Sequence, residues 1–195
     1  MAITINGDGT LTGVSVGGLP DGIVDTDMLA TDAVSAAKLG TNSFVSYAVI
    51  ADVKTSGTDG GTFTSGAWRT RDLNTEIFDP DGIVSISSNQ FILAAGNYLI
   101  EWLAPAVRIG EHKARLYDVT GDVSVQIGNN AFSSTDGGDL TFAFGSSRVT
   151  ITSSNTYRIE HRCLTGASLA YGFGNSTDIS STVEIYTVVK IFKEA

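Results

Sequence analysis

The stretch from Phe91 to Ala106 reads FILAAGNYLIEWLAPA, and it decides the fold. Apolar side chains alternate before the pair Gly96-Asn97 and again after it, as far as Pro105. A period of two is typical of a half-buried β-strand, and Gly-Asn is a turn former. The stretch therefore predicts two strands joined by a short turn, each with one face in a core.

The same alternation continues through the chain from residue 42 onward. Turn formers separate the apolar segments, as in Asp79-Pro80-Asp81-Gly82. About eight to ten short strands of this kind predict an all-β sandwich or jelly roll. Besides the opening stretch, the strand pattern covers residues 44–53, 123–127, 140–144, 149–151, 157–163, 169–173 and 182–192.

Composition excludes several classes of function. The 195 residues carry a formal charge of −9, from 12 Lys and Arg against 21 Asp and Glu. Affinity for nucleic acid comes largely from cations that displace counterions, so we expect no nucleic-acid partner. No apolar run reaches the length of about 18 residues that spans a membrane, and MAITINGDG resembles no secretory signal, so we expect neither insertion nor export.

The N-terminal region contains two ten-residue units, DGIVDTDMLA and TDAVSAAKLG, over residues 21–40. Val24 recurs as Val34 and Leu29 as Leu39, a stripe too narrow for one chain to bury. Several chains side by side would bring these residues around one axis and form a continuous core. We predict a stem segment over 1–41, with a strand-turn-strand over 1–19 and short helical turns after it, and a head domain over 42–195.

Two predicted strands, 44–53 and 182–192, are apolar on both faces. The outer face of an antiparallel sheet is polar when it meets water, so an apolar outer face indicates a second subunit. A loop of the same chain is the alternative. The residues predicted to face the axis of a cyclic oligomer are Val24, Leu29, Val34, Leu39, Phe44, Tyr47, Tyr186, Val188 and Phe192.

Four stretches of the predicted head share a recognisable pattern: FDPDGIVSISSNQFILAAGNYLIEWLAPA, RLYDVT, RVTITSSNTYRIEH and VEIYTVVKIFKEA. Together they resemble the globular heads of the complement q and tumour-necrosis-factor superfamily, and more narrowly the bacteriophage version of that domain. The resemblance covers roughly residues 44 to 193. Separately, GTLTGVSVGGLPDG at residues 9–22 and the two ten-residue units resemble segments of phage tail fibres.

The resemblance implies a ten-stranded jelly roll that forms a homotrimer on a slender stem and binds a surface without catalysis. We therefore expect a virion protein on the tail or capsid exterior: a short tail fibre whose head binds a host surface glycan or protein. Its N-terminus would contact other virion proteins. A capsid decoration protein or head fibre is the alternative, and a polysaccharide-degrading spike is the third.

Two sets of residues raise the question of catalysis or metal binding. His161 and Cys163 share one face of a strand, as a catalytic pair would, but their apolar neighbours favour packing in the core. Aspartates in turns offer oxygen ligands for calcium, yet Asx turns explain the same residues, and we expect no cofactor. These aspartates are Asp79, Asp81, Asp136 and Asp139.

Recognition of a surface is predicted for exposed aromatic and cationic side chains. Trp68 lies in the polar stretch TSGAWRTRDLN beside Arg69 and Arg71, and Trp with Arg is a frequent binding anchor. Arg108 and His112 belong to a second local basic cluster. The alternatives are that Trp68 packs under a neighbouring loop and that the second cluster is a solvated loop.

Overall fold

The computed structural model describes residues 4–5, 11–12, 44–166, 168–177 and 179–195. The chain divides into two compact units, residues 1–40 and 41–195. In the first unit, β1 (Thr4–Ile5) pairs antiparallel with β2 (Leu11–Thr12), as the predicted strand-turn-strand requires. The predicted helical turns, and Val24, Leu29, Val34 and Leu39, lie outside the described residues.

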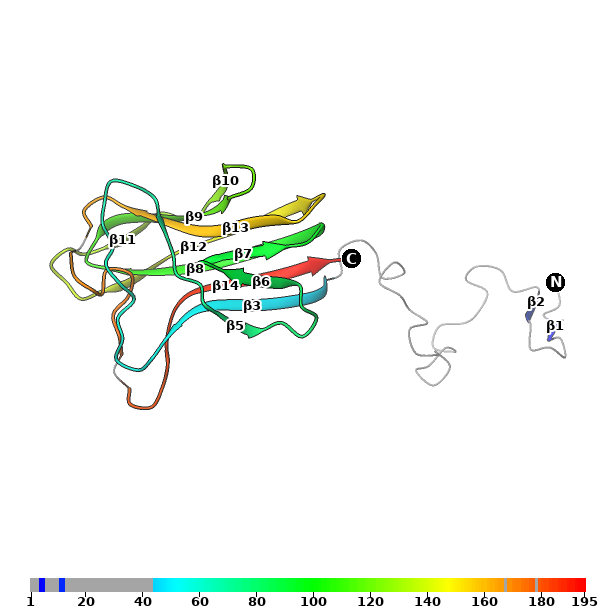
Figure 1. The fold of residues 1–195 in the computed structure, drawn as a ribbon, viewed down its shortest axis with the longest axis horizontal. Coiled ribbons are helices and arrows are strands. Elements are labelled where there is room, and N and C mark those ends of the chain that lie inside the picture. The colour runs from blue at the N-terminus through cyan, green and yellow to red at the C-terminus, as the bar shows by residue number, and fades with distance from the viewer. Residues whose placement is uncertain (1–3, 6–10, 13–43, 167, 178) are drawn as a thin grey trace. The chain divides into compact units, whose positions relative to one another are not determined.

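The second unit, the head, contains two antiparallel sheets (Figure 1). The first is a five-stranded sheet in the order β12-β8-β14-β3-β5. Its strands are β12 (Leu140–Ile151), β8 (Gly96–Val107), β14 (Glu184–Glu194), β3 (Phe44–Lys54) and β5 (Thr75–Phe78).

The second sheet has five strands along its main path, β10-β9-β13-β7-β6, and two short strands that pair beside it. Here β11 pairs with β9, and β4 pairs with β13. The strands are β10 (Val123–Ile127), β9 (Gly110–Asp118), β13 (Asn155–Cys163), β7 (Gln90–Leu93), β6 (Val84–Ser87), β11 (Ala131–Ser133) and β4 (Arg69–Thr70).

The connectivity is that of a jelly roll. Strands β7, β8, β9, β12, β13 and β14 belong alternately to the two sheets, with β10 and β11 in the same sheet as β9, so the chain crosses the sandwich repeatedly. The all-β jelly-roll prediction is confirmed, and β4 and β11 are added to the ten main strands. The described residues contain no helix, hence none that is long and apolar enough to cross a membrane.

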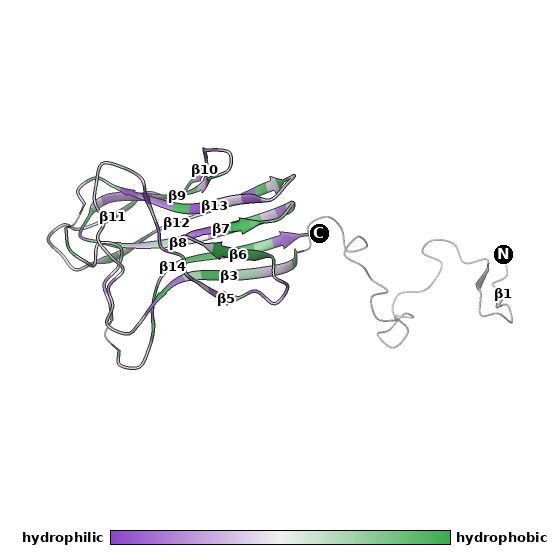
Figure 2. Ribbon diagram, viewed as in Figure 1, coloured by the Kyte–Doolittle hydropathy of each residue, from purple (hydrophilic) through white to green (hydrophobic). Residues whose placement is uncertain are grey.

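The core lies between the sheets and confirms the pattern of the opening stretch. Phe91, Leu93, Tyr98, Ile100 and Trp102 are all at most 3% exposed. Figure 2 shows the hydrophobic residues of β3, β6 and β7 in green. Full burial of such a side chain contributes about 1.5–3 kcal/mol, so these strands supply much of the stabilising free energy.

One predicted strand is wrong. Residues 169–173 form turns, in which Gly172 N–H donates to Leu169 O and Gly174 N–H donates to Tyr171 O. Gly172 packs against Phe63, and Gly174 has a φ of +141°, which a side-chain-bearing residue rarely adopts. The two glycines therefore turn the chain where the alternation of Leu169 and Tyr171 suggested an extended strand.

The strand directions define two ends of the head. Phe44 begins β3 beside Glu194 at the end of β14, so the chain enters the head and leaves it at the same end. This entry end lies at the right of Figure 1. From Gly96 near that end, β8 runs to Val107 at the far end, where the loop 134–139 and the segments 164–166 and 168–177 also lie.

Candidate functional site: the outer face of the five-stranded sheet

Side chains on the outer face of the five-stranded sheet form rows across the strands. One row contains Phe144, Leu103 and Val188, which lie opposite one another on β12, β8 and β14. Another contains Leu99 and Phe192, with Tyr47 following on β3. Each is exposed or half-buried in the single chain, so apolar surface covers much of a face that usually meets water.

Four aromatic rings cluster on this face at the entry end. Phe44 lies 5.2 Å from Phe192 between ring centroids, and Tyr47 stacks on Phe78 at 4.7 Å. Tyr47 also lies 6.3 Å from Phe192, which joins the two pairs. Phe44, Tyr47 and Phe78 remain 50%, 46% and 41% exposed, so the rings pack against one another but are still open to solvent.

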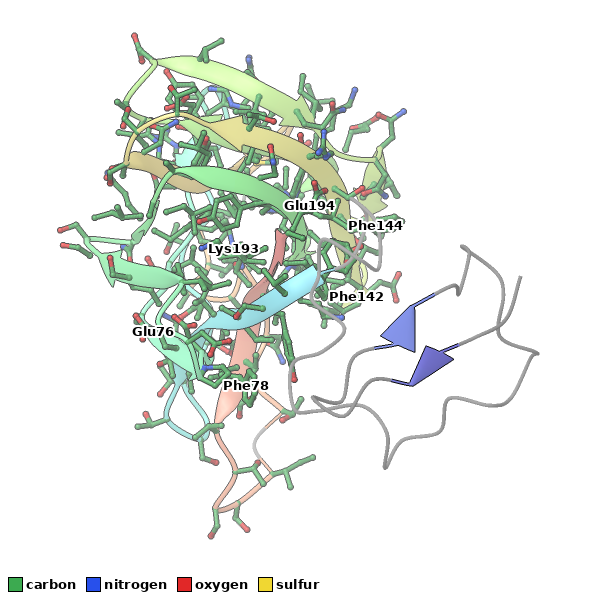
Figure 3. All side chains as sticks on the ribbon, turned by 90° about the vertical axis from the view of Figure 1, so that its right-hand side faces the viewer. Glu76, Phe78, Phe142, Phe144, Lys193 and Glu194 are labelled. Atoms are coloured by element: carbon green, nitrogen blue, oxygen red, sulfur yellow. The ribbon has the colours of Figure 1, made fainter. Side chains whose placement is uncertain are left out.

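A second apolar group lies on β12 toward the far end. Phe142 and Phe144 project outward and are 41% and 55% exposed (Figure 3). The inward residues beside them, Ala143 and Gly145, are small because Trp102 fills the core there: a Cβ on Gly145 would overlap the Trp102 ring. In this part of β12 large residues thus point outward and small ones inward, the reverse of a strand that faces water on its outer side.

Charges cross the middle of the face. Glu101 on β8 lies directly opposite Lys190 on β14, between the two apolar groups. A groove of about 580 Å³ opens beside them and is lined by Trp102, Phe144 and Val188 among others. Opposite charges at facing positions are favourable and impose a register on any partner that covers the face.

The structure places four predicted interface residues on this face: Phe44, Tyr47, Val188 and Phe192. Tyr186 is a correction, because it is only 4% exposed and its hydroxyl donates to Thr58 O at 2.7 Å. A β-bulge between Ile185 and Val188 reverses the side-chain phase and turns Tyr186 inward. Sequence reasoning did not assign Phe78, Phe142 and Phe144 to the face, although the small residues between the β12 aromatics were a usable signal.

Two predicted recognition residues lie on the surface of the other sheet. The Arg115 guanidinium stacks 4.2 Å above the half-buried Trp68 ring, and Arg69 is exposed. Arg108 instead ties loops together, since it donates to Gly137 O at 2.6 Å and to the Tyr171 hydroxyl at 3.0 Å. The structure therefore does not bring the five predicted recognition residues into one site.

Arg71 is a correction to the recognition set, because it is 1% exposed inside the head. Its guanidinium donates to Thr187 Oγ1 at 2.6 Å, to Phe173 O at 2.9 Å and to Pro105 O at 3.2 Å, and lies 4.2 Å above the Phe173 ring. Burial lowers its pKa to about 10, so the group remains charged at neutral pH. Arg71 is a structural cation that joins the two sheets.

His112 is the second correction: it is 2% exposed and packs against His161, which is fully buried as predicted. His112 Nδ1 lies 2.8 Å from His161 Nε2, and His112 Nε2 lies 2.9 Å from Thr141 Oγ1. His161 Nδ1 has no partner among the described residues. An unpaired acceptor is more common than an unpaired N–H, so we infer that His161 Nε2–H donates to His112 and that His112 Nε2–H donates to Thr141.

This arrangement requires both rings to be neutral. Burial, with Arg71 nearby, lowers the pKa of His112 to about 4 and holds that of His161 well below its ordinary value. Cys163 lies opposite His112 across β13 and β9. Burial raises the pKa of its thiol to about 11, so it is not a thiolate at neutral pH, and a thiol without a charged histidine partner is a poor nucleophile.

The histidine pair predicts a loss of stability in acid. The unfolded chain takes up protons at these rings below about pH 6.5, whereas the folded His112 does so only near pH 4, so stability falls as the pH drops through this window. From this pKa difference we expect His112 alone to lower the free energy of unfolding by about 2 kcal/mol between pH 7 and 4.5. The structural reason is that protonation of His112 Nδ1 would place two N–H donors face to face. Urea unfolding at both pH values measures it.

The control is the double variant His112→Gln/His161→Leu, which has no ring to protonate at this position. Carboxylates elsewhere in the head titrate equally in both proteins, so the difference between their pH profiles isolates the pair. An identical loss of stability in the two proteins would show that the pair does not carry the acid sensitivity.

The aspartates considered for calcium serve turns in the structure. Asp79 accepts from the N–H groups of Ile83 at 2.9 Å and Val84 at 3.0 Å, and Asp81 accepts from Ser46 Oγ at 2.6 Å. Asp136 and Asp139 lie in the far-end loop that Arg108 holds through carbonyl oxygens. Within the described residues, no three His, Cys, Asp or Glu side chains form a metal-binding cluster.

Comparison with known proteins adds similarities of fold. No family model matches the chain, and no curated protein matches it. Among solved structures, the globular domain of zebrafish complement 1qA protein aligns with 75% of this chain and 95% of its own, at 15% identity and a TM-score of 0.49. Murine APRIL aligns with 76% of this chain and 98% of its own, at 6% identity and a TM-score of 0.47. PRD1 vertex protein P5 aligns with 78% of this chain and 97% of its own, at 12% identity and a TM-score of 0.46.

Proposed function

We propose that the chain is a non-catalytic virion protein of a bacteriophage, a homotrimer whose head binds a surface. The observation that carries the proposal is the apolar outer face of the five-stranded sheet. Monomeric proteins rarely leave two such apolar groups exposed on one sheet face, so association that covers them is favourable. A cyclic arrangement covers the same face on every copy and leaves none open.

The threefold symmetry and the phage context come from the sequence. The head stretches resemble trimeric jelly-roll heads, and residues 9–40 resemble tail-fibre segments whose two units need three chains to form a core. Three heads on one stem bind three ligands at once, so retention on a surface depends on avidity more than on single-site affinity.

The position on the particle distinguishes a tail fibre from a capsid decoration protein. We expect an antibody against the head to mark the tail tips of intact particles in negative-stain electron microscopy. Uniform labelling of the capsid would favour the decoration protein, and particles without label would contradict a virion role. An antibody absorbed with excess purified head serves as the control.

A further inference from the structure

The outer face of the second sheet carries a row of cations along β9 and β13. Its outward positions include Lys113, Arg115, Arg158 and Arg162. This concentration is unusual in a chain with a formal charge of −9. The local electrostatic potential at this face is therefore more positive than the overall charge suggests, which favours an anionic ligand.

Two of these cations share one buried carboxylate within the sheet. Glu160, 3% exposed, accepts from Arg115 at 2.6 Å through one oxygen and from Arg158 at 2.6 Å through the other. Arg115 in turn stacks on Trp68 at 4.2 Å and lies 4.7 Å from the Tyr117 ring. These contacts fix the Trp68 ring in place before any ligand arrives.

The other two cations are not neutralised. Arg162 lies directly opposite Lys113 across β13 and β9, and facing like charges destabilise a sheet. The other six arginines donate to carboxylate or carbonyl oxygens; neither Arg162 nor Lys113 has an acceptor among the described residues. Departures of this kind from favourable pairing are typical of functional sites, where a ligand supplies the missing partner.

Lys113 and Arg162 line the same groove. It has a volume of about 520 Å³, and its lining includes Trp68, Leu164, Asn130 and Gly66 together with Lys113 and Arg162. Glu111 also lines it, so the groove holds two cations against one carboxylate. The groove lies where β9 begins and β13 ends, at the end of the head opposite to chain entry.

We propose that this groove binds the carboxylate-bearing sugars of an acidic polysaccharide. A flat indole ring packs against the apolar face of a pyranose, Arg162 and Lys113 pair with the carboxylate, and the Asn130 amide donates to hydroxyls. This proposal names a ligand for the surface binding proposed above, and its biological role rests on that proposed function. The groove itself is complete within one chain.

Calorimetric titration of the full chain with trigalacturonate tests the proposal. Loss of both unpaired cations in Lys113→Gln/Arg162→Gln is expected to weaken binding about 30-fold, and Trp68→Ala about 10-fold. Removal of the repelling carboxylate in Glu111→Gln is expected to tighten it about 3-fold. The matched control Arg148→Gln/Lys193→Gln removes the same charge near the entry end and is expected to stay within about twofold.

Two results would overturn the proposal. One is wild-type binding to neutral maltotriose or to a ribitol-phosphate polymer as strong as that to trigalacturonate. The other is a Lys113→Gln/Arg162→Gln variant that binds trigalacturonate as the control does. The mass of each protein in solution is measured alongside. A trimer that does not bind trigalacturonate would contradict the proposed ligand but not the proposed trimer. A monomer that binds trigalacturonate would contradict the trimer but not the ligand.

Discussion

We expect the replacement of Arg71 by methionine to lower the free energy of unfolding by about 3 kcal/mol. Methionine fills a similar volume but donates no hydrogen bond. The substitution therefore leaves Thr187 Oγ1, Pro105 O and Phe173 O buried without their donor. Relief from burying a charge offsets part of this cost, which is why the expected loss is smaller than the sum of three lost bonds.

Arg69→Met is the matched control for Arg71→Met. Arg69 lies two residues earlier in the same strand and loop but is exposed, and its donations to Thr64 O and Ser65 O are long at 3.3 and 3.4 Å. We expect its effect to stay within about 0.5 kcal/mol. Urea unfolding of both variants at pH 7 measures the difference. Equal stabilities would contradict the assignment of Arg71 as a cation that joins the sheets.

The second large effect concerns the outer face of the five-stranded sheet. We expect Phe144→Glu to weaken self-association at least about 100-fold, because a carboxylate would be buried against apolar residues of a neighbouring copy. The folded monomer tolerates the change, since Phe144 is 55% exposed. Sedimentation velocity over a concentration series, together with far-UV circular dichroism, separates dissociation from unfolding.

Phe132→Glu provides the control for Phe144→Glu. Phe132 is 59% exposed on β11 of the other sheet, so the same substitution there introduces the same charge at similar exposure. We expect the assembly to keep its mass. If Phe144→Glu also sediments like the wild type, the five-stranded sheet does not form the interface.

The regular parts of the head could be predicted from sequence because two sheets impose a period of two. The run from Tyr98 to Ala104 is buried at every second residue, as its pattern requires. The failure at Tyr186 came from a bulge, which inserts one residue and leaves no mark in the alternation. Periodicity therefore predicts a strand well and its side-chain phase only as far as the next bulge.

Isolated polar residues were harder to place. Arg71 appeared to be a surface residue because cations seldom occupy a core, and His112 because it belongs to a local basic cluster in the sequence. Their burial depends on partners far away in the chain: Phe173 O for Arg71, and His161 and Thr141 for His112. No local pattern in the sequence indicates such distant hydrogen-bond partners. The pairing of Lys113 with Arg162 is equally a product of register between β9 and β13.

Sedimentation equilibrium of the full chain at micromolar concentration addresses whether three copies cover one another's apolar sheet faces. One chain has a mass of 20.4 kDa, so we predict a single species of three times that mass, about 61 kDa. A folded species of 20.4 kDa, with the aromatic face open to solvent, would contradict the assembly and the avidity that depends on it.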